Sequence, residues 1–332
     1  MVERVLVFGG RGFLGRNIVT RLLSIGYHVR VFDLPSITPD LDHHHAQYID
    51  GDITDNQRVM EQTKNCDYVF HCAAMISFWD KQKPRQFEVN IGGTKNILKA
   101  CEYHLVKKII YTSTVSALGY VESPEHIGDE ETQFNWGKFS IGYHDSKNLA
   151  QTLVDEFAQN SNLQIVSLLP GTIFGRGHFS KFSANHYFTE IKSGKMFLYP
   201  KGGTNCVSVE DVVEGHIQAI EKGVSGEKYI LGGENLSYKE IFETIAQKMN
   251  VQAPRFQVPH LLGIFVGRLL EILAYITKRP PLLTSKVIFA SANHCYYSSK
   301  KAQSCLDYSF RPFTAIAEDV CSYLEETQEG EN

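Results

Sequence analysis

Short apolar runs and helical stretches alternate along the first 170 residues of the chain. The apolar runs are rich in β-branched and aromatic residues and are bounded by turn residues, which is typical of buried strands. Between them, apolar positions recur at the spacing of an amphipathic helix. Buried strands that alternate with helices predict a parallel sheet with helices on both faces. The expected strands are 4–10, 28–34, 46–53, 66–74, 107–117 and 164–170, and the expected helices are 13–26, a stretch ending near 65, 90–105 and a stretch from Tyr143 to about 160.

The alternation loosens after residue 171. The expected helices there are 184–194, 209–222, 237–249, 258–277 and 313–326, with short strands such as 228–233 between them. No low-complexity linker separates the two parts, so we expect them to pack together. The sequence therefore predicts an α/β fold of the Rossmann type. A doubly wound parallel sheet over 1–175, with strand and helix returns from about 202–225, would carry a smaller and mostly helical C-terminal lobe over 176–330.

Composition restricts the class of protein. The chain has 332 residues, of which 43% are hydrophobic and 21% charged, as expected for a globular protein with a sizeable core. A net charge of −4 argues against nonspecific binding to nucleic acid. The seven cysteines form no C-x-x-C pair and indicate reduced thiols in a cytoplasmic compartment. A strand begins almost at the N-terminus, so we expect no signal peptide.

One apolar stretch, residues 260–280, could contact a membrane. Arg268 and Glu271 lie near its middle, and central charges disfavour a spanning helix. We expect an amphipathic helix of the second lobe, with peripheral membrane contact as the alternative. The histidine run 43–45 has no further ligands at useful spacing, so no metal site is expected there.

A glycine-rich turn follows the first expected strand. It reads Gly9-Gly10-Arg11-Gly12-Phe13-Leu14-Gly15 and leads directly into the first expected helix. Glycines permit a tight turn and a close approach of the backbone to a pyrophosphate, which a helix N-terminus attracts. Strand, turn and helix in this order predict a dinucleotide site.

The acid at the end of the second strand, Asp33, bears on the choice of cofactor. Its distance from the turn suits a carboxylate that binds the hydroxyls of the adenosine ribose. A carboxylate there repels a 2′-phosphate, which favours NAD. Arg11 and Arg30 could reach such a phosphate, so NADP remains the alternative.

Further motifs follow in order along nearly the whole chain. They are "GGRGFLG" (9–15), Asp33, "GDITD" (51–55), "HCAA" (71–74), "NIGGTKN" (90–96), "YTSTVSALG" (111–119), Tyr143-His-Asp-Ser-Lys147, "LLPGTIFGRG" (168–177) and "VSVEDVVEGH" (207–216). Together they resemble the extended short-chain dehydrogenases/reductases, the NAD-dependent epimerase/dehydratase superfamily. Within it the chain is most similar to the 3β-hydroxysteroid dehydrogenase and dihydroflavonol reductase-like group, above all in its C-terminal residues 272–312.

The resemblance implies a cofactor site built from strand ends and turns. Asp52 and Ile53 would flank the adenine, and Pro170 with the turn after it would contact the nicotinamide amide. The implied cofactor residues are Gly9, Gly10, Arg11, Gly12, Phe13, Leu14, Gly15, Asp33, Asp52, Ile53, Cys72, Ala73, Ala74, Tyr143, Lys147, Pro170, Gly171 and Thr172. No metal is implied.

Tyr143 and Lys147 lie four residues apart and share one face of a helix. Oxidation of a secondary alcohol requires removal of the hydroxyl proton, and a phenol of ordinary pKa is a poor base at neutral pH. A nearby ammonium, together with the positive nicotinamide, would lower that pKa. The pair is therefore interpreted as a catalytic base with its activating lysine.

A second hydroxyl should bind the substrate oxygen as charge develops there. The end of the fifth strand offers Ser113 and Thr114, and strand alternation places them on opposite faces. The resemblance favours Thr114, with Ser113 as the alternative. It also implies that Asn90 helps to hold the active-site water and Lys147.

The second lobe would form the substrate pocket. Residues 256–289 are strongly apolar. We expect core packing to account for most of them. The others would contact a bulky apolar alcohol or ketone, such as a steroid or flavonoid. A nucleotide-sugar epimerase with tightly held NAD is the alternative function, and a cofactor-sensing regulatory protein is a third. Residues 114–116 lack an Asp-Glu pair, which counts against dehydratase chemistry. The resemblance suggests a homodimer through the helices 90–105 and 141–160.

Overall fold

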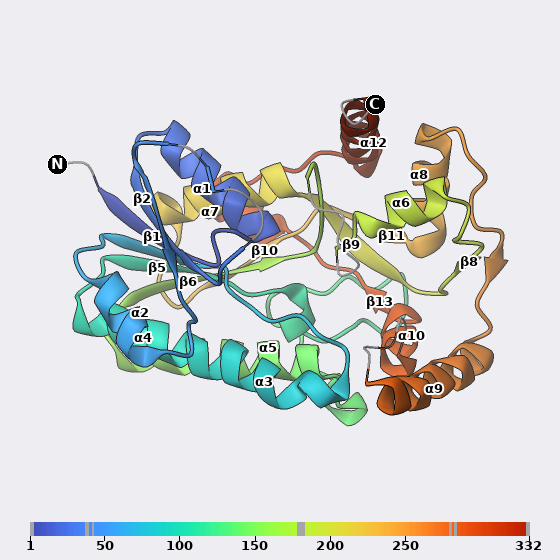
Figure 1. Ribbon diagram of the computed structural model, residues 1–332, viewed down its shortest axis with the longest axis horizontal. Coiled ribbons are helices and arrows are strands. Elements are labelled where there is room, and N and C mark those ends of the chain that lie inside the picture. The colour runs from blue at the N-terminus through green and yellow to red at the C-terminus, as the bar shows by residue number, and fades with distance from the viewer. Residues whose placement is uncertain are drawn as a thin grey trace.

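The computed structural model describes residues 3–36, 40–41, 43–177, 183–278, 281 and 284–329. Its centre is a sheet of seven parallel strands in the order β10-β6-β5-β4-β1-β2-β3 (Figure 1). The strands are β1 (Arg4–Phe8), β2 (His28–Asp33), β3 (Ala46–Asp50), β4 (Tyr68–His71), β5 (Lys108–Thr112), β6 (Gln164–Pro170) and β10 (Lys228–Leu231). This confirms the predicted Rossmann-type sheet.

Helices cover both faces of this sheet, as the alternation of apolar runs predicted. In Figure 1, α1 and α7 lie above the sheet and α2, α4 and α5 lie below it. Their bounds are α1 (Phe13–Ser24), α2 (Asn56–Thr63), α4 (Thr94–Tyr103), α5 (Gly142–Asn160) and α7 (Val209–Lys222). Successive residues of β1 face opposite cores, Val5 and Val7 toward α1 and Leu6 and Phe8 toward the other helices. The central strand β1 is therefore buried on both sides, whereas the edge strand β3 has no fully buried residue.

Several predicted strands are longer than the strands that form. β4 ends at His71 and β5 ends at Thr112, although apolar residues continue beyond both. The chain leaves the sheet at these points, and residues 72–75 then line a groove. Likewise, the predicted helix 90–105 is α4 preceded by a π-helical turn at Glu88–Gly93. The apolar residues after β5 stay buried, whereas those after β4 are partly exposed in the groove.

The stretch 228–233 was predicted as a short strand among the helices of the second lobe. Residues Lys228–Leu231 instead form β10, which pairs in parallel with β6 at the edge of the main sheet. The crossover helix α7 packs on α1 and reaches β5, so the chain returns to the first domain over α7 and β10. The return thus extends beyond the expected limit near residue 225.

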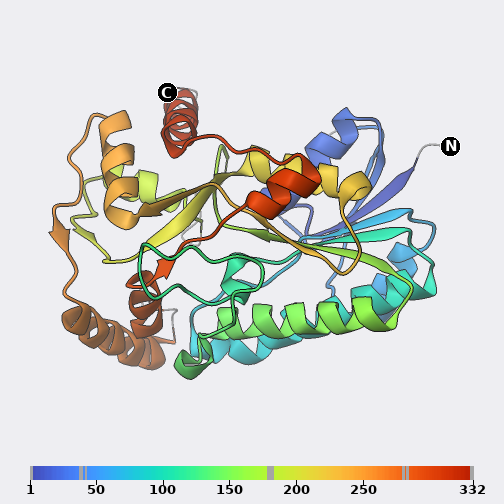
Figure 2. The ribbon, with the colours of Figure 1, turned by 180° about the vertical axis from the view of Figure 1, so that it is seen from behind.

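The remaining chain forms a lobe at the carboxyl edge of the main sheet. Its sheet holds β7 (Thr172–Phe174), β9 (Gly203–Ser208), β11 (Glu234–Ser237) and β13 (His294–Cys295), and β8 (Leu198–Tyr199) pairs with β12 (Phe256–Gln257). Its helices are α6 (His186–Lys192), α8 (Tyr238–Lys248), α9 (His260–Thr277), α10 (Ser285–Ser291) and α12 (Phe313–Glu329), while α11 (Lys300–Leu306) packs on α7. A short helix α3 (Lys83–Phe87) precedes the π-helical turn. Figure 2 shows the lobe from behind.

Asn205 joins the two sheets. Its buried side chain donates to the carbonyl of Gly233 (3.1 Å) and to Asn235 Oδ1 (2.7 Å), and accepts from the Gly233 N–H (2.8 Å). Gly171 and Gly232, which follow β6 and β10, pass so close to it that a Cβ at either would meet the Asn205 side chain. The lobe is therefore held directly against the strand ends of the main sheet.

The apolar helix α9 buries its small residues and exposes its large apolar side chains, the reverse of a usual amphipathic helix. Its small residues Gly263, Gly267 and Ala274 are buried, and the first two face α10 and the residues beside it. Its large apolar side chains lie outside: Leu261, Leu262, Phe265, Val266, Leu269, Ile272, Leu273, Tyr275 and Ile276 are each more than 40% exposed. The expectation that core packing accounts for most of this segment is therefore wrong. Leu282 and Leu283, which belong to the same expected set, lie outside the described residues.

Candidate active site

The glycine turn between β1 and α1 is shaped by two close approaches. Gly9 has φ +81°, a left-handed conformation that favours glycine, and lies against the backbone of Ala73. A Cβ on Gly15 would collide with the carbonyl oxygen of Gly9. Gly12 stands at the N-cap of α1 and provides no side-chain acceptor, so the first N–H groups of the helix have no side-chain cap. The turn thus presents a helix N-terminus suited to an anion.

Asp33 and Arg11 form a network beside this turn. The Asp33 carboxylate accepts the backbone N–H groups of Arg11 (2.8 Å) and Leu34 (2.7 Å). Burial raises the pKa of Asp33, and these hydrogen bonds oppose the rise. The Arg11 guanidinium binds Asp40 through Nε (2.7 Å) and Asp50 through Nη1 (2.7 Å). Its charge is therefore already matched by carboxylates.

A groove runs from the turn along the strand ends. Among the predicted cofactor residues it is lined by Gly9, Gly12, Asp33, Asp52, Ile53, Cys72, Ala73 and Ala74. Sequence reasoning missed its other lining residues, which are Phe32, Leu34, Gly51, Met75, Arg85 and Val89.

The predicted turn residues outside the lining shape the turn itself. Gly10 packs against Val19 and Val31, and Phe13 and Leu14 pack on the core.

Asp52 and Arg85, which both line the groove, form an ion pair. Burial alone would raise the pKa of Asp52, but hydrogen bonds from Thr54 and Arg85 hold it below its usual value. Arg85 stands three residues before Glu88, the acidic start of the π-helical turn, and also binds its carboxylate (2.7 Å). This spacing is the signal that could have revealed Arg85.

Lys147 is an ammonium buried at the end of β5. Its side chain projects from α5, donates to the Thr112 carbonyl (3.1 Å) and lies 5.2 Å from the centre of the Tyr111 ring. Burial lowers the pKa of Lys147 to about 8. Such a group changes its charge near neutral pH more readily than a surface lysine.

Tyr143 lies one turn before Lys147 on the same helix face. Burial raises the pKa of Tyr143 to about 12, and a hydrogen bond with the Thr114 side chain opposes that rise. The sequence predicted a lowered pKa for this phenol. In the protein by itself the opposite holds, because the same burial disfavours both the phenolate and the ammonium.

The structure separates the two hydroxyl candidates at the end of β5. Thr114 begins a 3₁₀ turn at Val115–Ala117 and its side chain bonds with that of Tyr143. Ser113 is 4% exposed and lies beside Tyr111. Thr114 is therefore the hydroxyl that meets the tyrosine.

Asn90 makes contacts other than the expected ones. Its amide accepts from the Met75 N–H (2.7 Å) and donates to the Met75 carbonyl (3.0 Å) and to Ser146 Oγ (2.9 Å). Ser146 in turn donates to the Tyr143 carbonyl (2.9 Å). Asn90 thus links Met75 to the first turn of α5. Both N–H groups of its amide bond to these partners, so neither is left to bond to Lys147.

Pro170 ends β6, Gly171 follows it, and Thr172 begins β7. The Gly171 N–H donates to the Leu231 carbonyl (3.2 Å), and the hydroxyls of Thr172 and Thr204 lie 2.6 Å apart. These residues are held by neighbouring strands and are not part of the groove lining described above.

Aromatic side chains that the sequence analysis did not select surround Tyr143. The Phe78 ring lies 5.9 Å from that of Tyr143, and the ring of Trp136 lies 4.7 Å from that of His144. Burial lowers the pKa of His144 to about 4, so its imidazole is neutral at physiological pH. The tyrosine therefore faces an apolar, aromatic environment.

Comparison with known proteins gives a consistent result. A model of the 3-beta hydroxysteroid dehydrogenase/isomerase family matches residues 6–240. A Synechocystis protein with the provisional name dihydroflavonol 4-reductase is 30% identical over 91% of this chain and 89% of its own length. The mouse sterol-4-alpha-carboxylate 3-dehydrogenase, decarboxylating, is 28% identical over 96% of this chain and 89% of its own length.

A solved structure of UDP-glucose 4-epimerase from Thermotoga maritima also superposes on the chain. Its TM-score is 0.80, and the match covers 98% of this chain and 100% of that one. The two sequences are 20% identical, so this likeness shows the fold alone.

The burial of Lys147 predicts a specific pH dependence of stability. Its pKa is about 8 in the folded protein against 10.5 in the unfolded chain, so the unfolded state binds more protons between these values. Stability from this group therefore rises with pH across that window. Relative to Lys147→Met, the free energy of unfolding of the wild type should increase by up to about 3 kcal/mol between pH 7 and pH 10.5. Urea unfolding at several pH values measures this difference.

The exposed Lys239→Met serves as the matched control and should show no comparable slope. A difference between wild type and Lys147→Met that stays constant over this range would mean that Lys147 is solvated.

Proposed function

The chain belongs to the 3-beta hydroxysteroid dehydrogenase/isomerase family, and from this we propose that it is a nicotinamide-dependent oxidoreductase that interconverts a secondary alcohol and a ketone on a bulky apolar substrate. Its relatives by sequence are named as sterol dehydrogenases and a dihydroflavonol reductase, which supports a steroid-like or flavonoid-like substrate. The observation that carries the proposal is the meeting of Tyr143, Thr114 and Lys147 at the strand ends beside the groove.

The residues divide the reaction between them. A bound NAD would supply the acceptor for the hydride that leaves the carbinol carbon. Tyr143 Oη takes the hydroxyl proton as that hydride departs, and Thr114 Oγ1 holds the substrate oxygen as it becomes a carbonyl. In the reverse direction Tyr143 returns the proton.

Because burial keeps the pKa of Tyr143 at about 12, the phenolate must be stabilised within the complex. The Lys147 ammonium, with its positive charge one turn away, provides that stabilisation. Asn90 acts at a distance by fixing the first turn of α5.

The cofactor residues fit NAD better than NADP. Three carboxylates, Asp33, Asp40 and Asp50, surround the Arg11 side of the ribose site. The only described cation of the turn is Arg11, and two of these carboxylates already bind its guanidinium. A 2′-phosphate would therefore meet net negative charge without a free basic partner.

The substrate would lie between Tyr143 and the second lobe. We assign the cofactor to the domain over 1–175 with its returning segment, and the substrate mainly to the lobe over 176–330. Phe78, together with Phe139 and Phe289, whose rings lie 3.8 Å apart, provides apolar surface between the lobe and α5. The homodimer expected through α4 and α5 remains part of this proposal, with Leu149 exposed on α5.

The alternatives receive less support. The epimerase likeness is one of fold, and a cofactor-sensing protein has no need of the Tyr143–Lys147–Thr114 arrangement.

We further infer that the protein acts in the cytoplasm and touches membranes through α9. No helix within the described residues is long and apolar enough to span a bilayer. The outward row of large apolar side chains on α9 suits the interface of a bilayer instead, where an apolar substrate would also dissolve.

The first prediction concerns catalysis. Tyr143→Phe should lower the rate of NADH formation from apolar secondary alcohols, including 3β-hydroxysteroids, by roughly 10²-fold or more, because the proton acceptor is lost. NAD binding, measured by calorimetry, should persist. The control is Tyr103→Phe, an exposed tyrosine on α4. Wild-type activity in the Tyr143 variant would contradict the mechanism, and tightly held NAD with no net NADH from any substrate would favour the epimerase.

The second prediction concerns the cofactor. The wild type should use NAD with a kcat/KM at least roughly tenfold above that for NADP. Asp50→Asn removes one of the two carboxylates on Arg11 and should narrow this preference a few-fold. Asp67→Asn, a carboxylate at the other end of the sheet, is the control. An unchanged preference in Asp50→Asn would show that Arg11 does not face the 2′ position.

The third prediction concerns membranes. The double variant Phe265→Glu/Leu269→Glu should bind phospholipid vesicles roughly tenfold or more weakly than the wild type, because two apolar anchors become charged. Co-sedimentation measures the bound fraction. Leu105→Glu changes a leucine that is 86% exposed but distant from α9 and should leave binding unchanged. A wild type that stays in the supernatant would end this part of the proposal.

A further inference from the structure

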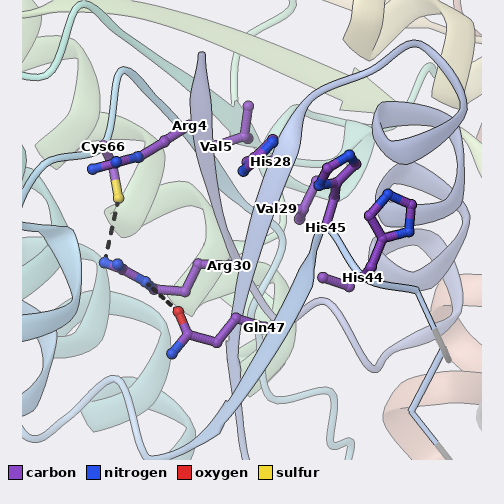
Figure 3. A pocket seen from close by; sticks show the side chains of 10 residues that line it. Arg4, Val5, His28, Val29, Arg30, His44, His45, Gln47 and Cys66 are labelled. Atoms are coloured by element: carbon purple, nitrogen blue, oxygen red, sulfur yellow. Dashed lines mark hydrogen bonds between the residues drawn. The ribbon is translucent and has the colours of Figure 1, made fainter. Parts of the chain in front are cut away.

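A second pocket lies at the amino ends of the strands, opposite the groove beside the glycine turn. It is formed at the amino ends of β1 and β2 and at the start of β3 (Figure 3). Its polar lining consists of Arg4, His28, Arg30, His44, His45 and Gln47, and no carboxylate is among its lining residues. The proposed reaction uses none of these side chains.

The two arginines of this pocket differ in their partners from Arg11, Arg21 and Arg85. Arg11, Arg21 and Arg85 each bind a carboxylate within 2.7 Å. Among the residues that the structure describes, neither Arg4 nor Arg30 forms an ion pair. The Arg30 guanidinium donates only to neutral acceptors, including the Gln62 carbonyl (2.6 Å), Gln47 Oε1 (3.4 Å) and Cys66 Sγ (3.7 Å). Two guanidinium groups without an ion-pair partner thus line one cavity, and the Asp67 carboxylate is near enough to Arg4 for their charges to interact.

The nearest described acids are engaged elsewhere. Asp67 accepts the Arg4 backbone N–H (2.9 Å) and pairs with Lys107 (3.0 Å), which also binds Glu3 (3.0 Å). Both acids therefore share the positive charge of Lys107 outside the pocket.

Three imidazoles lie beside the arginines in the lining of the pocket. The rings of His28 and His45 stack at 4.1 Å, and those of His44 and His45 lie 3.9 Å apart. Desolvation, followed by the charges of His44, His28 and His43, lowers the pKa of His45. The stacked rings do not form a metal site: no group of three or more ligand side chains within the described part of the chain could hold a metal ion.

We propose that this pocket binds a compact multivalent oxyanion of the phosphate type. Two guanidinium groups offer the forked donors that match phosphate oxygens, and the imidazoles add N–H donors and, once protonated, charge. An anion would offset the repulsion between the two guanidinium groups.

The position of the pocket favours a free anion over a lipid headgroup. Figures 1 and 2 place the amino ends of β1 and β2 beside the N-terminus and α9 at the other end of the long axis. A flat membrane that contacts α9 would therefore not reach the pocket.

The test is calorimetric titration of NAD-saturated protein with inorganic pyrophosphate, because NAD keeps the glycine turn occupied. Arg4→Gln should weaken binding roughly tenfold or more, as expected for the loss of a charged hydrogen-bonding partner. His28→Gln, which removes one of the stacked imidazoles, should weaken it less. Lys239→Gln removes the same charge from α8 and should bind like the wild type.

Arg30→Gln tests the second guanidinium, with thermal unfolding as a check because Arg30 also bonds to backbone carbonyls. Absence of saturable binding below millimolar pyrophosphate, or equal affinity in the wild type and Arg4→Gln, would overturn the proposal. Vesicles that contain phosphatidylinositol phosphate form a second arm. Arg4-dependent binding to these vesicles without binding of pyrophosphate would overturn the assignment to a free anion. The experiment measures anion binding to protein that already holds NAD. A protein without dehydrogenase activity could therefore still bind pyrophosphate, and failure of the proposed function would be told apart from failure of this proposal.

Discussion

The parallel arrangement of the main sheet is the constraint on which the rest of the structure depends. Because all seven strands run in one direction, all their carboxyl ends meet at one edge. Gly9, Asp33, Ala73 and Thr114 lie at these ends, although the first and the last are more than a hundred residues apart in the sequence. The joint at Asn205 then holds the second lobe against the same edge, so the substrate side and the cofactor side of the site share one rigid support.

The site is built at a cost in stability. Lys147 holds an ammonium in a place where burial lowers its pKa to about 8, and the same burial raises that of Tyr143 to about 12. An apolar pair would fit such a position with less penalty, but it could not move a proton. The contacts of Lys147 with the Thr112 carbonyl and the Tyr111 ring offset part of this cost. The catalytic role proposed for Lys147 would explain why a charge is kept there.

The two ends of the molecule carry opposite kinds of surface. At one end α9 turns its small residues inward and its large apolar residues outward. At the other end, the amino ends of β1 and β2 collect arginines and histidines without lining acids. The first surface suits a lipid interface and the second suits an anion, and the reacting groups lie between them.

The sequence by itself determined the order of strands and helices, the glycine turn, Asp33 and the Tyr143–Lys147 pair. These are local patterns, because strand periodicity, turn chemistry and i, i+4 spacing are all written within a few residues. Tertiary structure alone decided that Lys228–Leu231 joins the main sheet, that Asn90 bonds to Met75 and Ser146, and that the side chains of α9 face outward. Tertiary structure also decided the raised pKa of Tyr143 and the clustering of Arg4, His28 and His45. Each depends on which distant segments bury or surround a group, and desolvation and charge act through space rather than along the chain.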